Sequence, residues 1–295
     1  YLNQRRRPFL SFAAYQFMGG YGYSTVPGYP EIYLKRLVRG VGAGVQYPLS
    51  RFRRLELSVD AVHETRFRWA CDAISGTNIW LCGWEGEEDA YAYLAPEVAF
   101  VHDTALFGST GPLSGRRSRL SAGAFVGERR AHGLEADYRF YWNVRKRYAF
   151  ALRGVFAGEW GRDRERMAFG GPYSLRGYTQ DPLYGTSLAF ANLEFRFPFI
   201  EGFALAWPLR LGIYGIRGAL FCDFGAAWDD PADFRALRSG RGEGSFRLED
   251  VRASCGLRAA VNLGFMILRW DLSRRTDLAG WVGKAAGEVS IGAEF

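Results

Sequence analysis

Arg176 is the residue whose surroundings most clearly indicate chemistry, because it is the single arginine of the Gly-rich segment 170–186. A guanidinium group is a rigid fork of donors that binds carboxylates through charge-assisted hydrogen bonds. Two carboxylates follow, Glu194 and Asp223, in segments where apolar and polar residues alternate. We predict that Arg176 pairs with Asp223, with Glu194 nearby, and so holds the loop inside the fold. The alternative is that Arg176 is one exposed loop arginine among many.

The segment that carries Glu194 has two faces of opposite chemistry. From Ser187 to Phe199 the odd positions are small or apolar, whereas the even positions include Asn192, Glu194 and Arg196. A period of two predicts a strand that is buried on one face. An apolar row opposite a charged row is what a transmembrane β-barrel requires.

The same alternation recurs along the chain and predicts about 12 strands. We place them at residues 10–18, 36–49, 51–66, 90–104, 117–127, 134–145, 148–159, 187–199, 216–228, 251–262, 265–272 and 288–295. Tight links at 49–51, 145–148 and 262–265 alternate with long links at 19–35, 67–89, 160–186, 229–250 and 273–287. Short turns on one side and long loops on the other are typical of outer-membrane barrels.

Closure of the sheet follows from the physics of the bilayer. A strand edge exposed to hydrocarbon leaves backbone donors and acceptors unpaired, at a cost of several kcal/mol for each group. We therefore predict an all-β fold, a closed antiparallel transmembrane β-barrel in which the first and last strands pair. The Gly-rich loop, on the extracellular side, is predicted to fold into the lumen.

Composition agrees with a membrane-embedded sheet. Aromatic residues make up 16% of the 295 residues, and the 9 Trp and 16 Tyr recur near predicted strand ends, where membrane interfaces favour them. No stretch approaches the roughly 20 uncharged apolar residues of a membrane helix. The formal charge of +7 comes from short basic runs at strand boundaries, with contact to phosphorylated lipid as a second interpretation. No nucleic-acid-binding motif is present, so no nucleic acid is expected as a partner.

The four cysteines form two pairs of different kinds. Cys71 and Cys82 lie in a polar link, where an oxidising compartment favours a disulfide. Cys222 and Cys255 instead fall on the apolar faces of separate predicted strands, where a free cysteine behaves as a small hydrophobic residue.

The remaining sequence motifs give no indication of a metal site or of catalysis. Neither cysteine pair has CxxC spacing and the three histidines form no HExxH pattern, so we expect no metal. No G-x-S-x-G elbow occurs. We therefore expect neither a cofactor nor an enzymatic activity.

Three motifs in this order resemble a known family. They are SLRGY at 174–178 after GGPY, NLEFRFP at 192–198 and LFCDFG at 220–225. The chain is similar to the barrel domain of the BamA/TamA superfamily (the bacterial surface antigen family), whose inward-folded loop carries a (V/I/L)RG(Y/F) tip. The resemblance matches Arg176, Gly177 and Tyr178 to that tip, and Phe221 and Asp223 to the family's FxDxG strand.

The resemblance also sets expectations for organisation and localisation. It implies an integral protein of the bacterial outer membrane, with residues 1–295 forming a single barrel domain. Typical members have 16 strands, more than are predicted here, and carry periplasmic POTRA modules, which we expect to be absent from this chain. The last residues resemble the C-terminal signal by which barrels are recognised for insertion, with Val289, Ile291, Ala293 and Phe295 on one face. A plain closing strand accounts for the same pattern, and the two interpretations are compatible.

Three functions remain open at this stage. The first is assistance to the insertion or translocation of proteins at the outer membrane, through a seam between the first and last strands. Its implied partners are outer-membrane lipids, client outer-membrane proteins, and periplasmic or lipoprotein partners. The second is a structural anchor or scaffold of an envelope complex. The third is a passive pore, which an inserted loop would obstruct. In that interpretation the inward-facing arginines give a preference for anions, and they are Arg139, Arg252, Arg258 and Arg269.

Overall fold

The computed structural model shows an all-β chain. It describes residues 2–3, 8–24, 32–73, 80–108, 110–145, 147–179, 182–205, 211–239 and 246–292. Side chains are described within these ranges outside 2–3, 20–24, 32–34, 68–73, 80–89, 203–205, 211–214, 238–239 and 246. Within the described ranges, no helix is long and apolar enough to cross a membrane.

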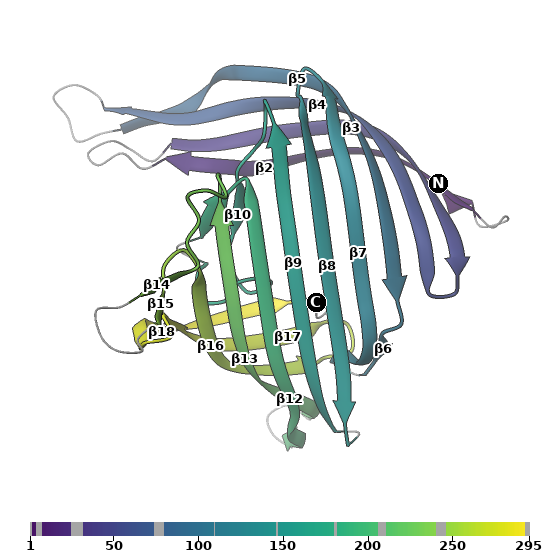
Figure 1. Ribbon diagram of the computed structural model, residues 1–295, viewed down its shortest axis with the longest axis vertical. Coiled ribbons are helices and arrows are strands. Elements are labelled where there is room, and N and C mark those ends of the chain that lie inside the picture. Colours follow the sequence, from purple (N-terminus) through teal and green to yellow (C-terminus); the bar gives the residue numbers. More distant parts are fainter. Residues whose placement is uncertain are drawn as a thin grey trace. The chain divides into compact units, whose positions relative to one another are not determined.

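One antiparallel sheet of 14 strands contains most of these residues (Figure 1). Along its path the strands are β1 (Leu2–Asn3), β2 (Phe9–Ser24), β3 (Ile32–Ser50), β4 (Arg53–Ala73), β5 (Trp80–Asp103), β7 (Pro112–Gly127), β8 (Ala131–Val144), β9 (Tyr148–Gly161), β12 (Ser187–Leu205), β13 (Leu211–Trp228), β16 (Arg252–Asn262), β17 (Ile267–Thr276) and β18 (Trp281–Ile291). The short strand β6 (Leu106–Phe107) pairs with β7. Two hairpins, β10 (Met167–Phe169) with β11 (Leu183–Gly185) and β14 (Leu237–Ser239) with β15 (Phe246–Leu248), lie outside the sheet.

The predicted fold class is confirmed, and each predicted strand corresponds to one long strand of the sheet. The two others, β1 and β6, have only 2 residues each. Pairing between the first and last strands stays a prediction. The predicted links at 67–89 and 273–287 were too long, because β4 runs to Ala73, β5 begins at Trp80 and β18 begins at Trp281.

A bulge explains why the start of β18 was missed. The register with β17 shifts between Ser273 and Arg275, which pair with Ala286 and Val282. Gly283 lies in the extra segment with φ 68°, a conformation that other residues rarely adopt. The bulge interrupts the period of two, so the alternating sequence pattern of β18 begins only beyond it.

Two compact units make up the chain. The first contains residues 1–99, 122–132 and 161–163, and the second contains residues 100–121, 133–160 and 164–295. Each unit has strands with one polar and one apolar face.

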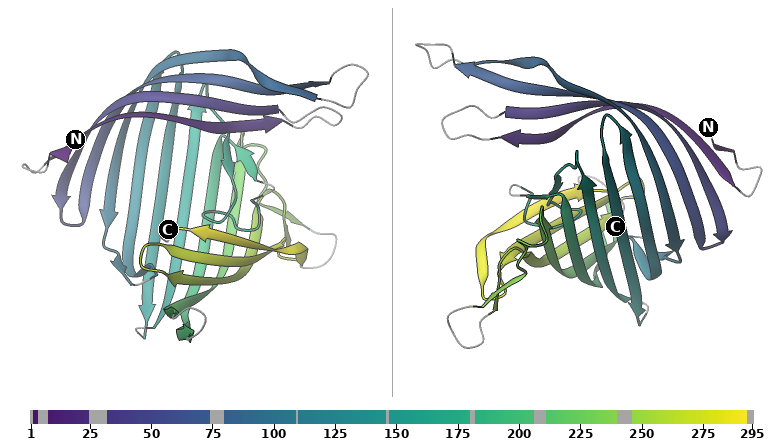
Figure 2. Two further views of the ribbon diagram at one scale, coloured as in Figure 1. Left: turned by 180° about the vertical axis from the view of Figure 1, so that it is seen from behind. Right: turned by 45° about the horizontal axis from the view of Figure 1, so that its top comes forward.

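In the first unit, β2, β3, β4 and β5 run side by side (Figure 2). Their polar face buries Glu64, whose carboxylate accepts hydrogen bonds from Tyr93 at 3.1 Å and from Arg66 at 2.9 Å. Gly40 also lies on this face. A Cβ at this position would come within 2.5 Å of the Tyr15 ring, so glycine makes room for that ring. Gly42 and Gly44, further along β3 on the same face, make room in the same way for the side chains of Asp60 and Ser11.

In the second unit, β9, β12, β13, β16, β17 and β18 follow one another, and β18 ends the series (Figure 2). The apolar face is exposed at Leu193, Leu220, Leu257 and Trp270. The opposite face buries Glu194, Asp223 and Asp271 completely. In both units, we call the sheet face with exposed apolar side chains the apolar face, and the face with buried polar side chains the polar face.

Cys222 and Cys255 form a disulfide, so the prediction that they are free small hydrophobic residues was wrong. They lie directly opposite each other in the β13–β16 register. Alternation placed both on the apolar face but did not determine which residues pair across the two strands. In the chain-entropy account, a link across a separation of 33 residues stabilises the fold by about 3 to 4 kcal/mol. Cys71 and Cys82, the predicted disulfide, lie outside the described side chains.

Candidate functional site: a buried loop arginine

The segment 170–179, which follows β10, crosses the polar face of the second unit. It is folded on itself, because the Gly171 N–H donates to the Leu175 carbonyl at 2.9 Å and the Ser174 N–H donates to the Gly171 carbonyl at 3.0 Å. Leu175 and Tyr178 pack with Phe169, Leu188 and Phe190 in one buried cluster. The loop is therefore attached by apolar packing on both sides of Arg176.

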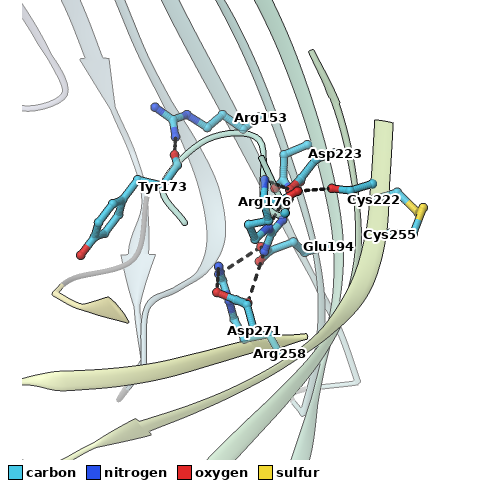
Figure 3. Close-up of polar contacts among 12 residues, drawn as sticks. Arg153, Tyr173, Arg176, Glu194, Cys222, Asp223, Cys255, Arg258 and Asp271 are labelled. Atoms are coloured by element: carbon cyan, nitrogen blue, oxygen red, sulfur yellow. Dashed lines mark hydrogen bonds and ion pairs between the residues drawn. A yellow bond between two sulfur atoms is a disulfide. The ribbon is translucent and has the colours of Figure 1, made fainter. Parts of the chain in front are cut away.

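Arg176 points from the loop toward the strands (Figure 3). Its Nε and Nη2 atoms donate to the two carboxylate oxygens of Asp223, each at 2.6 Å. Its Nη1 atom donates to Glu194 Oε1 at 2.9 Å. The guanidinium also stacks over the Phe221 ring, with 3.4 Å from Cζ to the ring centroid. This is a bidentate ion pair with a second carboxylate and an aromatic platform.

Other arginines surround the same carboxylates. Arg258 donates to Glu194 at 3.1 Å and to Asp271 at 2.7 Å. Arg196 lies 2.9 Å from the other oxygen of Glu194. The three arginines and three carboxylates carry balanced formal charge. We call these six residues the loop site: Arg176, Glu194, Arg196, Asp223, Arg258 and Asp271.

Strand register explains how residues far apart in sequence meet here. Asn192 pairs with Asp223 across β12 and β13, and Asp223 pairs with Ser254 across β13 and β16. Asn192 donates to Asp223 at 2.5 Å, and the Ser254 hydroxyl donates to the Arg176 carbonyl at 2.7 Å. The backbone of the loop tip is therefore bound as well as its side chain.

Small residues leave room for the arginine and its platform. A Cβ at Gly225 would come within 2.5 Å of the Phe169 ring, and a Cβ at Gly256 would come within 2.8 Å of the Phe221 ring. The FxDxG motif thus supplies, at alternate positions of β13, the platform, the carboxylate and a space for the loop. Gly177 itself has φ 82°, which favours glycine at the turn after Arg176.

The charge of Arg176 is maintained despite its burial. Burial by itself lowers the pKa of the guanidinium, but the charge and hydrogen bonds of Asp223 and the charge of Glu194 outweigh it and raise that pKa above its ordinary value. The ion pairs therefore persist as long as the carboxylates are ionised.

Beyond Arg176, the loop contacts the last strand of the sheet. The Thr179 hydroxyl donates to Glu288 Oε1, and the Gly177 N–H donates to Glu288 Oε2 at 3.4 Å. The Tyr173 hydroxyl donates to the carbonyl of Ile291. One loop thus makes polar contacts with β12, β13, β16 and β18.

The structure brings the predicted set Arg176, Asp223, Glu194 and Phe221 into contact, and Gly177 and Tyr178 lie in the same loop tip. Val289 and Ile291 lie on the apolar face, 66% and 55% exposed. Ala293 and Phe295 lie outside the described residues.

Sequence reasoning missed the roles of Arg258, Asp271, Ser254, Tyr173 and Glu288. Arg258 was placed on the inward face but interpreted as a pore-lining residue. Only register could show that it faces Asp271, with which it pairs across β16 and β17.

Antiparallel strands with one polar and one apolar face, and a loop arginine buried against the polar face, define the class of outer-membrane β-barrel proteins with an inserted loop. Residues 102–277 match the model of the Omp85 superfamily domain. This match covers more than half of the chain, and the chain belongs to the Omp85 superfamily, which confirms the resemblance seen in the motifs.

Two solved structures share the fold. BamA from Haemophilus ducreyi lacking POTRA domains 1–3 has a TM-score of 0.59 and 14% identity, over 96% of this chain and 62% of that one. CdiB from Acinetobacter baumannii has a TM-score of 0.52 and 14% identity, over 96% of this chain and 47% of that one. The chain spans less than two thirds of either protein. No curated protein sequence matches it.

Proposed function

We propose that this chain is a non-enzymatic outer-membrane barrel domain that assists the insertion or translocation of other proteins, and that it acts through the edge of its last strand. The observation that carries the proposal is the position of β18. It ends the strand order, and within the described residues it pairs only with β17. Membership of the Omp85 superfamily and the fold shared with BamA and CdiB support the same conclusion.

The edge of β18 that faces away from β17 has no partner strand among the described residues, and it offers a row of backbone donors and acceptors. A client strand that pairs with this edge satisfies them by β-augmentation, and side-chain pockets are not needed for that step. The energy comes from the folding of the client, so no chemical step is required. Client outer-membrane proteins and periplasmic or lipoprotein partners are part of this proposal, as is placement in the bacterial outer membrane.

The loop site has a specific part in this mechanism. Because the loop is fixed to β12, β13 and β16 through Arg176, it is a rigid base for the contacts to Glu288 and Ile291 in β18. We infer that the loop keeps β18 in register while its far edge exchanges partners.

A first prediction tests the contact to the last strand. Replacing Glu288 by alanine removes the acceptor of Thr179 and Gly177, so we expect backbone amides of β18 to exchange hydrogen at least ten-fold faster, with β13 unchanged. Hydrogen exchange read by mass spectrometry measures this. Lys284→Ala, in the same strand, is the matched control, because Lys284 makes no polar contact with the described residues. Equal protection of β18 in both variants would contradict the inference.

The function itself is tested by fixing the seam. In a variant whose native cysteines are all replaced by alanine, one new cysteine replaces a residue from Leu10 to Ala14 of β2. A second new cysteine replaces a residue from Val289 to Ile291 of β18. We expect one such pair to cross-link on oxidation and to slow the insertion of a urea-denatured client barrel into liposomes at least ten-fold. Reduction of the same sample should restore the rate.

The outcomes separate the alternatives. If neither the reduced nor the oxidised protein inserts the client, a structural anchor is favoured. If the cross-linked form inserts the client at the full rate, opening of the seam between the first and last strands is not required for insertion. A passive pore has less support from the geometry, because Arg258 and Arg139, predicted to line the lumen, donate to Asp271 and Asp137 at 2.7 and 2.9 Å. The charge of Arg258 is therefore balanced within the loop site, whereas Asp137 is shared by Arg139 and Arg153.

A further inference from the structure

A groove of about 880 Å³ lies on the apolar face of the first unit, over β2 to β5 and the end of β7. Its floor is a row of paired small and apolar residues, Ala14, Val41 and Ala61. The next row contains three polar residues in register, because Gln16 pairs with Arg39 and Arg39 pairs with His63. A polar row beside an apolar hollow is the shape that an amphiphile fits.

The surface around this row is otherwise apolar. Toward the β3–β4 turn, the same face of β3 carries Val41, Ala43, Val45, Tyr47 and Leu49. Beyond the row, Met18 is 59% exposed and apolar. Gln16, Arg39 and His63 thus form a polar patch within the face that the proposed membrane placement turns toward lipid.

The position of the polar row Gln16, Arg39 and His63 along the bilayer normal identifies the part of the lipid that it contacts. Ten residues separate Arg39 from Leu49, which is roughly 33 Å of strand and about 25 Å across the bilayer at a tilt of about 40°. The apolar band of a membrane barrel has about this height. If the tight β3–β4 turn is periplasmic, the row lies at the headgroup boundary of the outer leaflet.

The polar groups of the row have capacity left for a ligand. Arg39 Nε donates to Gln16 Oε1 at 3.0 Å, which fixes the orientation of the guanidinium. Among the described residues, its two terminal amino groups and the His63 ring have no hydrogen-bond partner. At a lipid-facing surface such donors require an acceptor, and a guanidinium binds a phosphate with two parallel hydrogen bonds.

We propose that this groove binds a phosphorylated lipid of the outer leaflet. Its phosphate accepts hydrogen bonds from Arg39 and His63, and an acyl chain lies over Ala14 and Ala61. The proposal rests on the membrane placement and not on client insertion, so a failure of either leaves the other testable. Charge complementarity selects a phosphorylated lipid over an uncharged one, and over a second copy of this apolar face.

The test uses the purified chain in a nonionic detergent, with phosphatidic acid as the probe and diacylglycerol of the same chains as the uncharged control. Native mass spectrometry counts the lipids retained. We expect one phosphatidic acid for each chain and at least ten-fold lower retention of diacylglycerol. Equal retention of the two lipids, or dimers held without lipid, would overturn the proposal.

Variants locate the site. We expect Arg39→Gln to reduce retention at least five-fold, and Ala61→Phe to do the same without a change of charge, because the ring fills the groove. His63→Gln provides an independent test if either variant fails to show the heat-modifiable gel shift of a folded barrel. Arg51→Gln, at the turn of the same hairpin, is the matched control and should change retention less than two-fold. An equal loss in Arg39→Gln and Arg51→Gln would overturn the assignment.

Discussion

Replacing Glu194 by glutamine is expected to destabilise the second unit by about 3 to 5 kcal/mol, which is typical when one partner of a buried ion pair is removed. Glu194 is fully buried and its carboxylate lies within 3.1 Å of Arg176, Arg196 and Arg258. Glutamine keeps the shape but removes the charge that three guanidinium groups share. The remaining carboxylates, Asp223 and Asp271, then face three buried positive charges.

The loss is measured as the temperature at which the compact, fast-migrating form disappears from gels of unboiled samples. A change of this size corresponds to roughly 6 to 20 °C. Glu201→Gln is the matched control in the same strand. Glu201 pairs with Arg147 at 2.6 Å, but their side chains are 74% and 67% exposed. Exposed pairs contribute less than about 1 kcal/mol, so equal effects in the two variants would refute the central role of Glu194.

Alternation made much of this architecture predictable from the sequence. A period of two identifies a strand and its two faces without any knowledge of the partner strand, so the inward positions of Glu194, Phe221 and Asp223 followed from the pattern alone. The tight links at 49–51, 145–148 and 262–265 each join strands that are neighbours in the sheet, because antiparallel neighbours need only a short connection. The bulge at Gly283 is the place where the period failed, and there the predicted strand began several residues late.

Register was the missing information. The disulfide between Cys222 and Cys255 and the pairing of Arg258 with Asp271 both depend on which residues stand opposite each other. The contact of Glu288 with Thr179 depends instead on the path of the loop over the sheet. A shift of one position would turn every side chain to the other face, but shifts of two leave the pattern unchanged. Alternation therefore restricts register without determining it.

The surroundings of Arg176 also combine a contact that the sequence predicted with contacts that it did not. The motif indicated a pair with Asp223, and a single ion pair in a wet lumen would be screened. The structure instead places Arg176 in a balanced cluster of six charges, with its side chain 2% exposed. The further arginines and carboxylates come from three strands, β12, β16 and β17, and no local pattern links them.

Arg176→Ala is expected to release the loop and to lower stability by about 3 to 5 kcal/mol, because Asp223 is left fully buried without a guanidinium partner. The loop tip also loses its fixed position, so we expect chymotrypsin to cleave after Tyr178, now 5% exposed, at least ten-fold faster. Arg166→Ala is the control in the preceding part of the loop. Arg166 pairs with Asp229 at 2.9 Å, but its side chain is 60% exposed, so neither quantity should change.

A double-mutant cycle with Asp223→Asn separates the ion pair from general damage to the loop. If the cost of Arg176→Ala comes from the stranded carboxylate, neutralising Asp223 recovers part of it, and the two substitutions are less than additive by about 2 kcal/mol or more. If the cost comes from lost packing by Leu175 and Tyr178, the two effects add, because the apolar cluster does not contain Asp223. Additive losses, with cleavage after Tyr178 unchanged in Arg176→Ala, would show that packing holds the loop and that the buried charges do not.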